Sequence, residues 1–146
     1  MRRFFVDTNI LIYLADPPAP KHWASRSMLD QLVLSGMIPV FSPQIAYEFW
    51  TVATRPVTVN GLGWGAERAR KTIEHYRIEF ETLHDTPTVF DLWLDLVTTH
   101  NLKGKRIHDA HILATMQAHR VTQILTFNAS DFPPVTDLSI LTPAQS

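Results

Sequence analysis

The feature that most constrains the fold is an alternation of short apolar segments with longer amphipathic ones. Segments 2–6, 37–41, 121–127 and 138–141 are rich in aromatic and β-branched residues, as buried strands are. Parallel strands need long crossover connections, and helices usually supply them. The alternation therefore predicts an α/β fold with a mainly parallel sheet of four to five strands, flanked by helices.

Helical spacing of apolar residues fills the intervals between these strands. Ser42 followed by Pro43 is a typical helix start, and the segment 57–65 holds three of the five glycines, which predicts a flexible surface loop. Segment 78–83 fits either a further strand or an extension of the preceding helix, and both interpretations stay open. The predicted helices are 8–15, 23–36, 43–54, 66–77, 89–99 and 107–119.

Chain length and composition limit the class of protein. We expect the 146 residues, 45% of them hydrophobic, to form one domain, residues 1–146, around one core. The absence of cysteine excludes disulfides and thiolate metal sites, and we expect a cytoplasmic protein without export signal or membrane anchor. A net charge of −1 provides no general attraction for nucleic acid, so any RNA contact must come from local basic patches.

Three carboxylates stand at informative places. Asp7 directly follows the first strand, where α/β sheets bind ligands, although its position alone favours an N-cap role. Glu48 lies among apolar residues of a predicted helix, which requires either an arginine partner or a cation. Asp109 lies in the first turn of a late helix, where compensation of the helix dipole is the alternative explanation.

Taken together, these carboxylates predict a site for a hard cation. Oxygen ligands select Mg²⁺ or Mn²⁺, and Mg²⁺ binds one or two carboxylates together with substrate phosphates. Such an ion supports phosphodiester hydrolysis. A zinc site at His108 and His111 is a weaker interpretation, because their spacing matches no known zinc pattern.

The motifs Val6-Asp7-Thr8-Asn9, Glu48 within a helix, His108-Asp109-Ala110 and Thr126-Phe127-Asn128 occur in that order along the chain. In this combination the whole chain resembles a PIN domain, and most closely the VapC toxins of bacterial toxin–antitoxin pairs. The resemblance implies a PIN-like α/β/α fold and an acidic metal site at Asp7, Glu48 and Asp109. It also implies cleavage of RNA, such as tRNA or ribosomal RNA, a homodimer, and inhibition by a VapB-like antitoxin.

One residue departs from the family pattern. Family members commonly carry a fourth acidic residue where this chain has Asn128, and Asp131 is a candidate to replace it. Asn128 offers a carbonyl oxygen but no charge, which would weaken a second metal site. Thr8, Asn9 and Thr126 are candidates to hydrogen-bond the ligands, with turn capping as the alternative.

The basic residues before Asp109 are candidates for phosphate contact. Lys105 and Arg106, together with Lys103, either bind the RNA backbone or form a solvated loop. Arg55 and Trp64 are weaker candidates for base contact, and we favour packing of Trp64 in the core or in a dimer.

Two further functions remain open. A phosphatase of the haloacid-dehalogenase type would use an aspartate after the first strand, but its second aspartate is replaced here by Asn9. A PIN-like module that binds RNA or protein without cutting it is consistent with the departure at Asn128.

Overall fold

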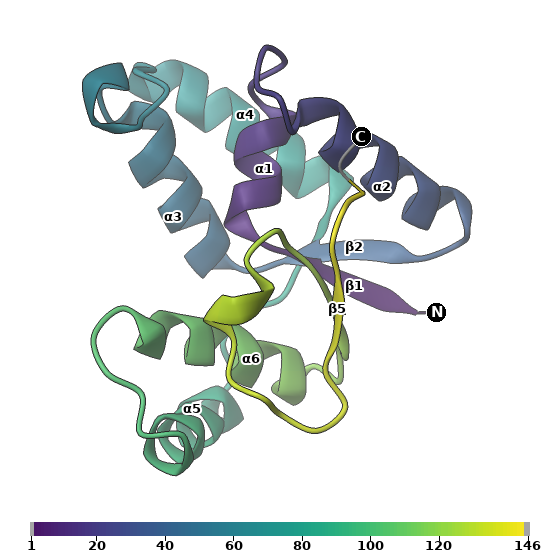
Figure 1. Ribbon diagram of the computed structural model, residues 1–146, viewed down its shortest axis with the longest axis vertical. Helices are drawn as coiled ribbons and strands as arrows, with labels where there is room; N and C mark the ends of the chain where they lie inside the picture. The colour runs from purple at the N-terminus through teal and green to yellow at the C-terminus, as the bar shows by residue number, and fades with distance from the viewer. Residues whose placement is uncertain (1, 145–146) are drawn as a thin grey trace.

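The computed structural model describes residues 2–144, which build a five-stranded sheet covered by helices on both faces (Figure 1). The strand order is β3-β2-β1-β4-β5, and every adjacent pair is parallel. This confirms the predicted α/β class and the parallel sheet. The strands are β1 (Arg3–Val6), β2 (Ile38–Phe41), β3 (Glu81–Thr82), β4 (Gln123–Leu125) and β5 (Ser139–Leu141).

Helices α1 to α4 lie on one face of the sheet, and α5 and α6 lie on the other (Figure 1). In residues 2–144, none of the helices is long and apolar enough to cross a membrane. Two short 3₁₀ segments, η1 (Val57–Val59) and η2 (Ala129–Asp131), lie in the connections. The α-helices are α1 (Thr8–Leu14), α2 (His22–Leu34), α3 (Pro43–Thr54), α4 (Ala66–Glu79), α5 (Pro87–Thr99) and α6 (Arg106–Ala118).

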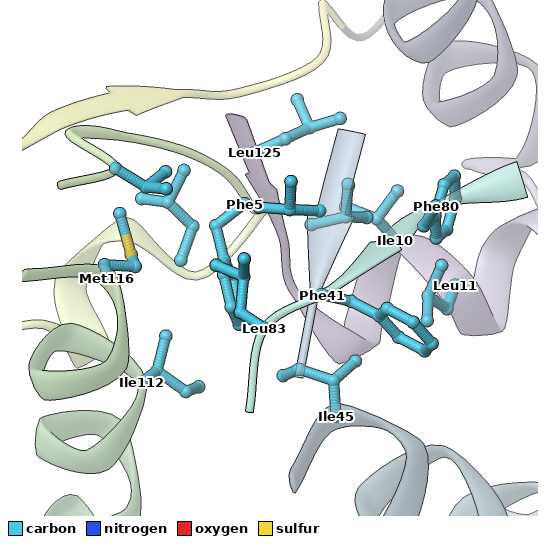
Figure 2. Close-up of a cluster of buried hydrophobic side chains, with 14 of the residues drawn as sticks. Phe5, Ile10, Leu11, Phe41, Ile45, Phe80, Leu83, Ile112, Met116 and Leu125 are labelled. Carbon is cyan, nitrogen blue, oxygen red and sulfur yellow. The ribbon is translucent and has the colours of Figure 1, made fainter. Parts of the chain in front are cut away.

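Burial on both faces explains why the central strand is continuously apolar. Phe4, Phe5 and Val6 of β1 are fully buried, although successive strand residues point to opposite faces. In Figure 2, Ile112 and Met116 of α6 lie on one side of the strands, and Ile10 and Leu11 of α1 lie on the other. The hydrophobic effect therefore fixes both helical layers on the same sheet.

The order of the strands creates a switch point beside β1. The chain leaves β1 through α1 and α2 to β2 on one side, whereas α5 and α6 on the opposite face lead to β4 on its other side. In such a sheet, the carboxyl ends of the two strands at the reversal border a crevice that binds ligands. The backbone N–H of Asp7 donates to the carbonyl of Leu125 (3.1 Å), which joins these two ends.

The open question at segment 78–83 has a mixed answer. Helix α4 continues to Glu79, and the strand is reduced to Glu81–Thr82, so each interpretation describes part of the segment. Phe80 is buried at the junction and accounts for the abrupt change, because its ring packs against Phe41 and Tyr76.

The surface loop predicted at 57–65 is confirmed as a mostly exposed connection that begins with η1, and hydrogen bonds tie it to the end of α3. Gly61 donates to the Pro56 carbonyl (3.0 Å), and Trp64 donates to the Ala53 carbonyl (2.8 Å). The indole of Trp64 packs edge-on against the buried ring of Phe49. This confirms the preferred interpretation of Trp64 as a residue that packs in the core.

Gly61 is required in this segment for steric reasons. A Cβ built at Gly61 would lie 1.8 Å from the Arg55 carbonyl oxygen, so the backbone must shift to accept a side chain. We expect Gly61→Ala to lower the free energy of unfolding by about 1–3 kcal/mol, measured by urea denaturation. Gly65→Ser is the matched control, since its Cβ meets open space and serine is a good N-cap for α4. Equal stability of the two variants would contradict the steric argument.

Candidate active site

Asp7 lies at the carboxyl end of β1 and is nearly buried, with 7% of its surface exposed. Its Oδ1 accepts a hydrogen bond from the backbone N–H of Thr8 (2.7 Å), which makes it the N-cap of α1. Its Oδ2 accepts from the hydroxyl of Thr126 (2.8 Å) and from the amide of Asn9 (3.1 Å). Asp7 therefore caps α1 with one carboxylate oxygen, while hydrogen bonds to the other oxygen fix the orientation of the side chain at the crevice.

Asn9 and Thr126 connect the end of β1 to the end of β4. The Asn9 amide nitrogen also donates to Thr126 Oγ1 (3.1 Å), and the Asn9 carbonyl oxygen accepts from the backbone N–H of Phe127 (3.0 Å). The backbone N–H of Asn128 donates to Thr126 Oγ1 (3.0 Å). We call the linked side chains of Asn9 and Thr126 the Thr126–Asn9 brace. Each polar group of this brace has a partner, so the Asp7 carboxylate is held by a rigid hydrogen-bond network.

Glu48 of α3 is half-buried and faces α1. Its Oε2 accepts from the hydroxyl of Thr8 (2.6 Å), and its Oε1 accepts from the Gln44 amide (3.0 Å). The arginine partner that the sequence left open is not found among the salt bridges of residues 2–144. Both polar contacts are neutral, so the negative charge of Glu48 is not neutralised.

Sequence reasoning missed Gln44, which positions two elements at once. Its amide nitrogen donates to Glu48 and also to the His108 carbonyl (2.9 Å), so it connects α3 to the first turn of α6. The available signal was the spacing of four residues between Gln44 and Glu48, which places the two side chains on one helix face.

Asp109 enters from the opposite layer, in the first turn of α6. It is half-buried, and the fully buried Ala110 and the nearly buried Ile112 and Leu113 anchor the helix behind it. Helix α6 thus carries Asp109 to the crevice that Asp7 borders on the sheet side. The position at a helix N-terminus is favourable for a carboxylate, as expected from the helix dipole.

Both aspartates hold a proton more tightly than usual. Burial raises the pKa of Asp7 to about 6 against the opposing hydrogen bonds from Thr126 and Thr8, and the charge of Glu48 raises it further. Burial, followed by the charges of Asp131, Asp7 and Glu48, raises the pKa of Asp109 to about 7. The carboxylates therefore repel one another across a shared space, which is typical of functional sites.

A cleft of about 600 Å³ brings the predicted residues together. Its apolar wall comes from α1, α3 and the segment after η1, and Thr126 lies buried behind Asp7. Asp16, Tyr13 and Asn60 also line it. No pattern in the sequence singles these residues out, because their position depends on how α1 and η1 pack. The predicted residues in its lining are Asp7, Thr8, Asn9, Glu48, Asp109, Asn128 and Asp131.

A second hollow, about 840 Å³, adjoins the cleft and carries the predicted basic residues. Lys105 and Arg106 line it together with Glu48, Asp109 and Asp131, three residues that also line the cleft. Arg106 donates to the carbonyls of Ser130 (3.2 Å) and Asp131 (3.3 Å), and its charge lowers the pKa of Asp109. Lys103 lies exposed in the preceding turn and lines neither hollow.

The donor set fits a hard cation bound partly through water. Asp7, Glu48 and Asp109 offer oxygen atoms, and their mutual repulsion would be relieved by a positive ion. Among residues 2–144, no three acidic or histidine side chains stand close enough to hold an ion together. Mg²⁺ commonly takes one or two carboxylates and keeps several waters. This spacing therefore suits Mg²⁺ bound partly through water better than an ion that side chains enclose completely.

The two histidines considered for zinc lie outside the acidic cleft. His111 Nε2 lies 2.9 Å from Asp85 Oδ1, and His108 is exposed on the neighbouring turn of α6.

The fold and cleft agree with the comparison to known families. The model of the PIN domain matches residues 4–135, so this chain belongs to the PIN-domain family. Ribonuclease VapC24 of Mycobacterium tuberculosis is 26% identical over 129 residues, which cover 87% of each chain.

Solved structures share the fold at lower identity. VapBC2 from Rickettsia felis, bound to a DNA fragment of its promoter, superposes with a TM-score of 0.72 at 14% identity and covers 96% of this chain and 98% of that one. VapC20 of Mycobacterium tuberculosis, a toxin that cleaves the sarcin-ricin loop, gives a TM-score of 0.66 at 18% identity over 88% of this chain and 92% of that one. VapBC-1 from nontypeable Haemophilus influenzae gives a TM-score of 0.70 at 20% identity and covers 96% of this chain and 97% of that one.

The raised pKa values predict how pH affects the metal-free protein. The two aspartates bind protons more tightly in the folded chain than at the ordinary value of 3.8, so the free energy of unfolding should fall as pH rises from about 4 to about 7. We expect Asp109→Asn to be more stable than the unaltered chain at pH 8 in EDTA and to show a flatter pH dependence.

Urea denaturation at a series of pH values measures this effect. Asp91→Asn, which changes an exposed aspartate of α5 outside the cleft, is the control and should follow the unaltered chain. Loss of stability in Asp109→Asn at pH 8 would show that its carboxylate stabilises the fold instead of straining it.

Proposed function

We propose that this chain is a metal-dependent endoribonuclease that hydrolyses RNA phosphodiester bonds at the acidic cleft. The observation that carries the proposal is the convergence of Asp7, Glu48 and Asp109, from both layers of the fold, on one open cleft without a basic neutralising partner among the described residues. Membership of the PIN-domain family and the similarity to Ribonuclease VapC24 support the same reaction.

The side chains have distinct tasks in this proposal. Asp7, Glu48 and Asp109 would hold Mg²⁺ or Mn²⁺ partly through bridging water molecules. Thr126 and Asn9 orient Asp7, and Thr8 and Gln44 orient Glu48. When bound, the ion supplies water activation and neutralises charge developing at phosphorus. Lys105 and Arg106 at the adjoining hollow would attract the phosphate backbone towards the cleft.

The similar solved structures support a biological setting for this reaction, because they include VapBC proteins. We infer that this chain acts as a toxin, is neutralised by a VapB-like antitoxin, and forms a homodimer. RNA with an exposed loop, such as tRNA or ribosomal RNA, is the proposed substrate class.

Asp131, and not Asn128, is the residue that would supply the fourth acidic side chain of the cleft. Both residues line the cleft, but only Asp131 contributes a charge, and it is the largest charge effect on Asp109. Asn128 contributes its backbone N–H to the Thr126 brace.

The nuclease proposal predicts metal-dependent cuts in RNA. We expect the purified chain to cleave total cellular RNA at discrete positions with Mg²⁺ or Mn²⁺ but not with EDTA. Asp7→Asn and Asp109→Asn should each reduce the rate by at least about 100-fold, because each removes a carboxylate of the cation site. Mapping of new RNA ends by primer extension measures the cuts.

Controls separate lost chemistry from lost folding. Asp91→Asn should cleave as the unaltered chain does, and Asp109→Asn should remain folded by circular dichroism. A folded, antitoxin-free chain that binds Mn²⁺ in calorimetry but leaves all RNA uncut would favour the non-catalytic binding module. Cleavage that persists in EDTA would refute the metal dependence.

Restoring a carboxylate at position 128 tests the charge of the cleft. We expect Asn128→Asp to bind Mn²⁺ more tightly, by up to about 10-fold, because affinity for hard cations rises with the number of charged ligands. Isothermal titration calorimetry measures the change, and Asn101→Asp, an exposed asparagine outside the cleft, is the control. Equal affinities in all three proteins would place residue 128 outside the field of the ion.

A further inference from the structure

A third hollow lies between α5 and α6 and contains most of the exposed aromatic surface of that layer. This α5–α6 groove, of about 410 Å³, is lined by Phe90 and Trp93 of α5, His108 and His111 of α6, and Asp85 in the segment before α5. Phe90 is 65% exposed, although such a ring normally seeks burial. None of the functions assigned above uses this groove.

One of the two rings of the aromatic surface is held in place by a hydrogen bond. The rings of Phe90 and Trp93 are nearly parallel, with an angle of 17° and centroids 6.2 Å apart. Trp93 is fixed by its indole N–H, which donates to the Ile107 carbonyl of α6 (2.8 Å). A flat ligand therefore meets, at Trp93, a ring that does not have to be ordered on binding.

A carboxylate stands at the edge of the groove in a fixed position. His111 Nε2 lies 2.9 Å and 3.2 Å from the two oxygens of Asp85, whose side chain remains 61% exposed. A carboxylate has about four acceptor positions, so Asp85 can accept further hydrogen bonds from a ligand. A carboxylate beside a flat apolar surface matches the amino edge of a nucleobase.

The groove is connected to the acidic cleft through the basic hollow. His108 lines both the groove and the hollow of Lys105 and Arg106, and Asp109 lines both that hollow and the cleft. Residues 105–109 span about 6 Å along α6, at 1.5 Å per residue. Residues that line the groove, the basic hollow and the cleft thus lie within about one helical turn of one another.

This order matches the chemistry of single-stranded RNA. Bases stack on aromatic side chains, and the phosphate backbone is attracted to lysine and arginine. We propose that the α5–α6 groove takes one unstacked RNA base whose backbone crosses Lys105 and Arg106 towards the cleft. In this arrangement Asp85 selects a base with an exocyclic amino group, adenine, cytosine or guanine, over uracil. The inference rests on the proposed nuclease function.

Short RNA oligomers test the groove independently of cleavage. Binding of fluorescein-labelled hexamers of adenylate, cytidylate and uridylate to the full chain is measured by fluorescence anisotropy in EDTA. We expect Phe90→Ala to bind the adenylate and cytidylate hexamers roughly 10-fold more weakly, because a stacking surface is lost. Trp23→Ala is the matched control: Trp23 is 72% exposed, belongs to α2 on the other face of the sheet, and should leave binding unchanged.

The selectivity of Asp85 gives a second, separate result. Asp85→Asn should remove the preference for the adenylate and cytidylate hexamers over the uridylate hexamer. Asp91→Asn changes a residue of α5 that does not line the groove and should keep this preference. A preference that survives in Asp85→Asn overturns the role of Asp85. Unchanged RNA affinity in Phe90→Ala overturns the whole inference, as does the absence of hexamer binding by the unaltered chain.

The outcomes also separate the groove from the nuclease and from self-association. If Phe90→Ala weakens hexamer binding while the unaltered chain cuts no RNA with metal, the base-binding role of the groove is supported and the nuclease function is refuted. If the chain cuts RNA and Phe90→Ala binds and cuts equally well, the nuclease function is supported and the base-binding role is refuted. A dimer that becomes monomeric in Phe90→Ala by sedimentation, with unchanged hexamer affinity, would assign this face to contact between copies of the chain.

Discussion

The pairing of β1 with β4 is the constraint on which the site depends. The N–H of Asp7 extends this pairing to the Leu125 carbonyl, and the side chains of Asp7, Asn9 and Thr126 continue it beyond the strands. Because the connections leave β1 and reach β4 on opposite faces, no crossover helix covers the space between these two strand ends. A crevice open to ligand is therefore a consequence of topology, and the polar brace fixes what points into it.

Repulsion between the carboxylates of the cleft destabilises the folded chain, and the hydrophobic core offsets this effect. Asp7 is almost buried, and its charge and those of Glu48 and Asp131 act on Asp109 across a low-dielectric space. A core that buries Phe4, Phe5 and Val6 completely supplies the stability that permits such a cluster. Strain of this kind at one place, within an otherwise consistent structure, is typical of a functional site.

The distribution of charge also resolves the conflict between a nearly neutral chain and an RNA substrate. A net charge of −1 gives no long-range attraction, but Lys105 and Arg106 stand within one helical turn of Asp109. In the proposed function, this positive charge would attract the backbone of the substrate without forming an ion pair with the carboxylates, because Arg106 donates to the carbonyls of Ser130 and Asp131. Local placement accomplishes here what overall composition does not.

The secondary-structure elements and the fold class could be predicted from the residue pattern. Periodicity identified the strands and helices, and the position of Asp7 after an apolar strand indicated the edge of the sheet at which a site forms. The residue pattern also identified Glu48 as an unusual charge on an apolar helix. These inferences succeed because hydrophobic patterning and helix starts are local properties of the chain.

Which distant groups meet became known only from the packing of the elements. The role of Gln44 between α3 and α6 and the approach of Asp131 to Asp109 depend on how the layers pack. The same holds for the groove of Phe90 and Trp93, which exists only because α5 lies against α6. Contacts between residues far apart in the chain leave no periodic signal in one sequence, since they are set by the packing of whole elements.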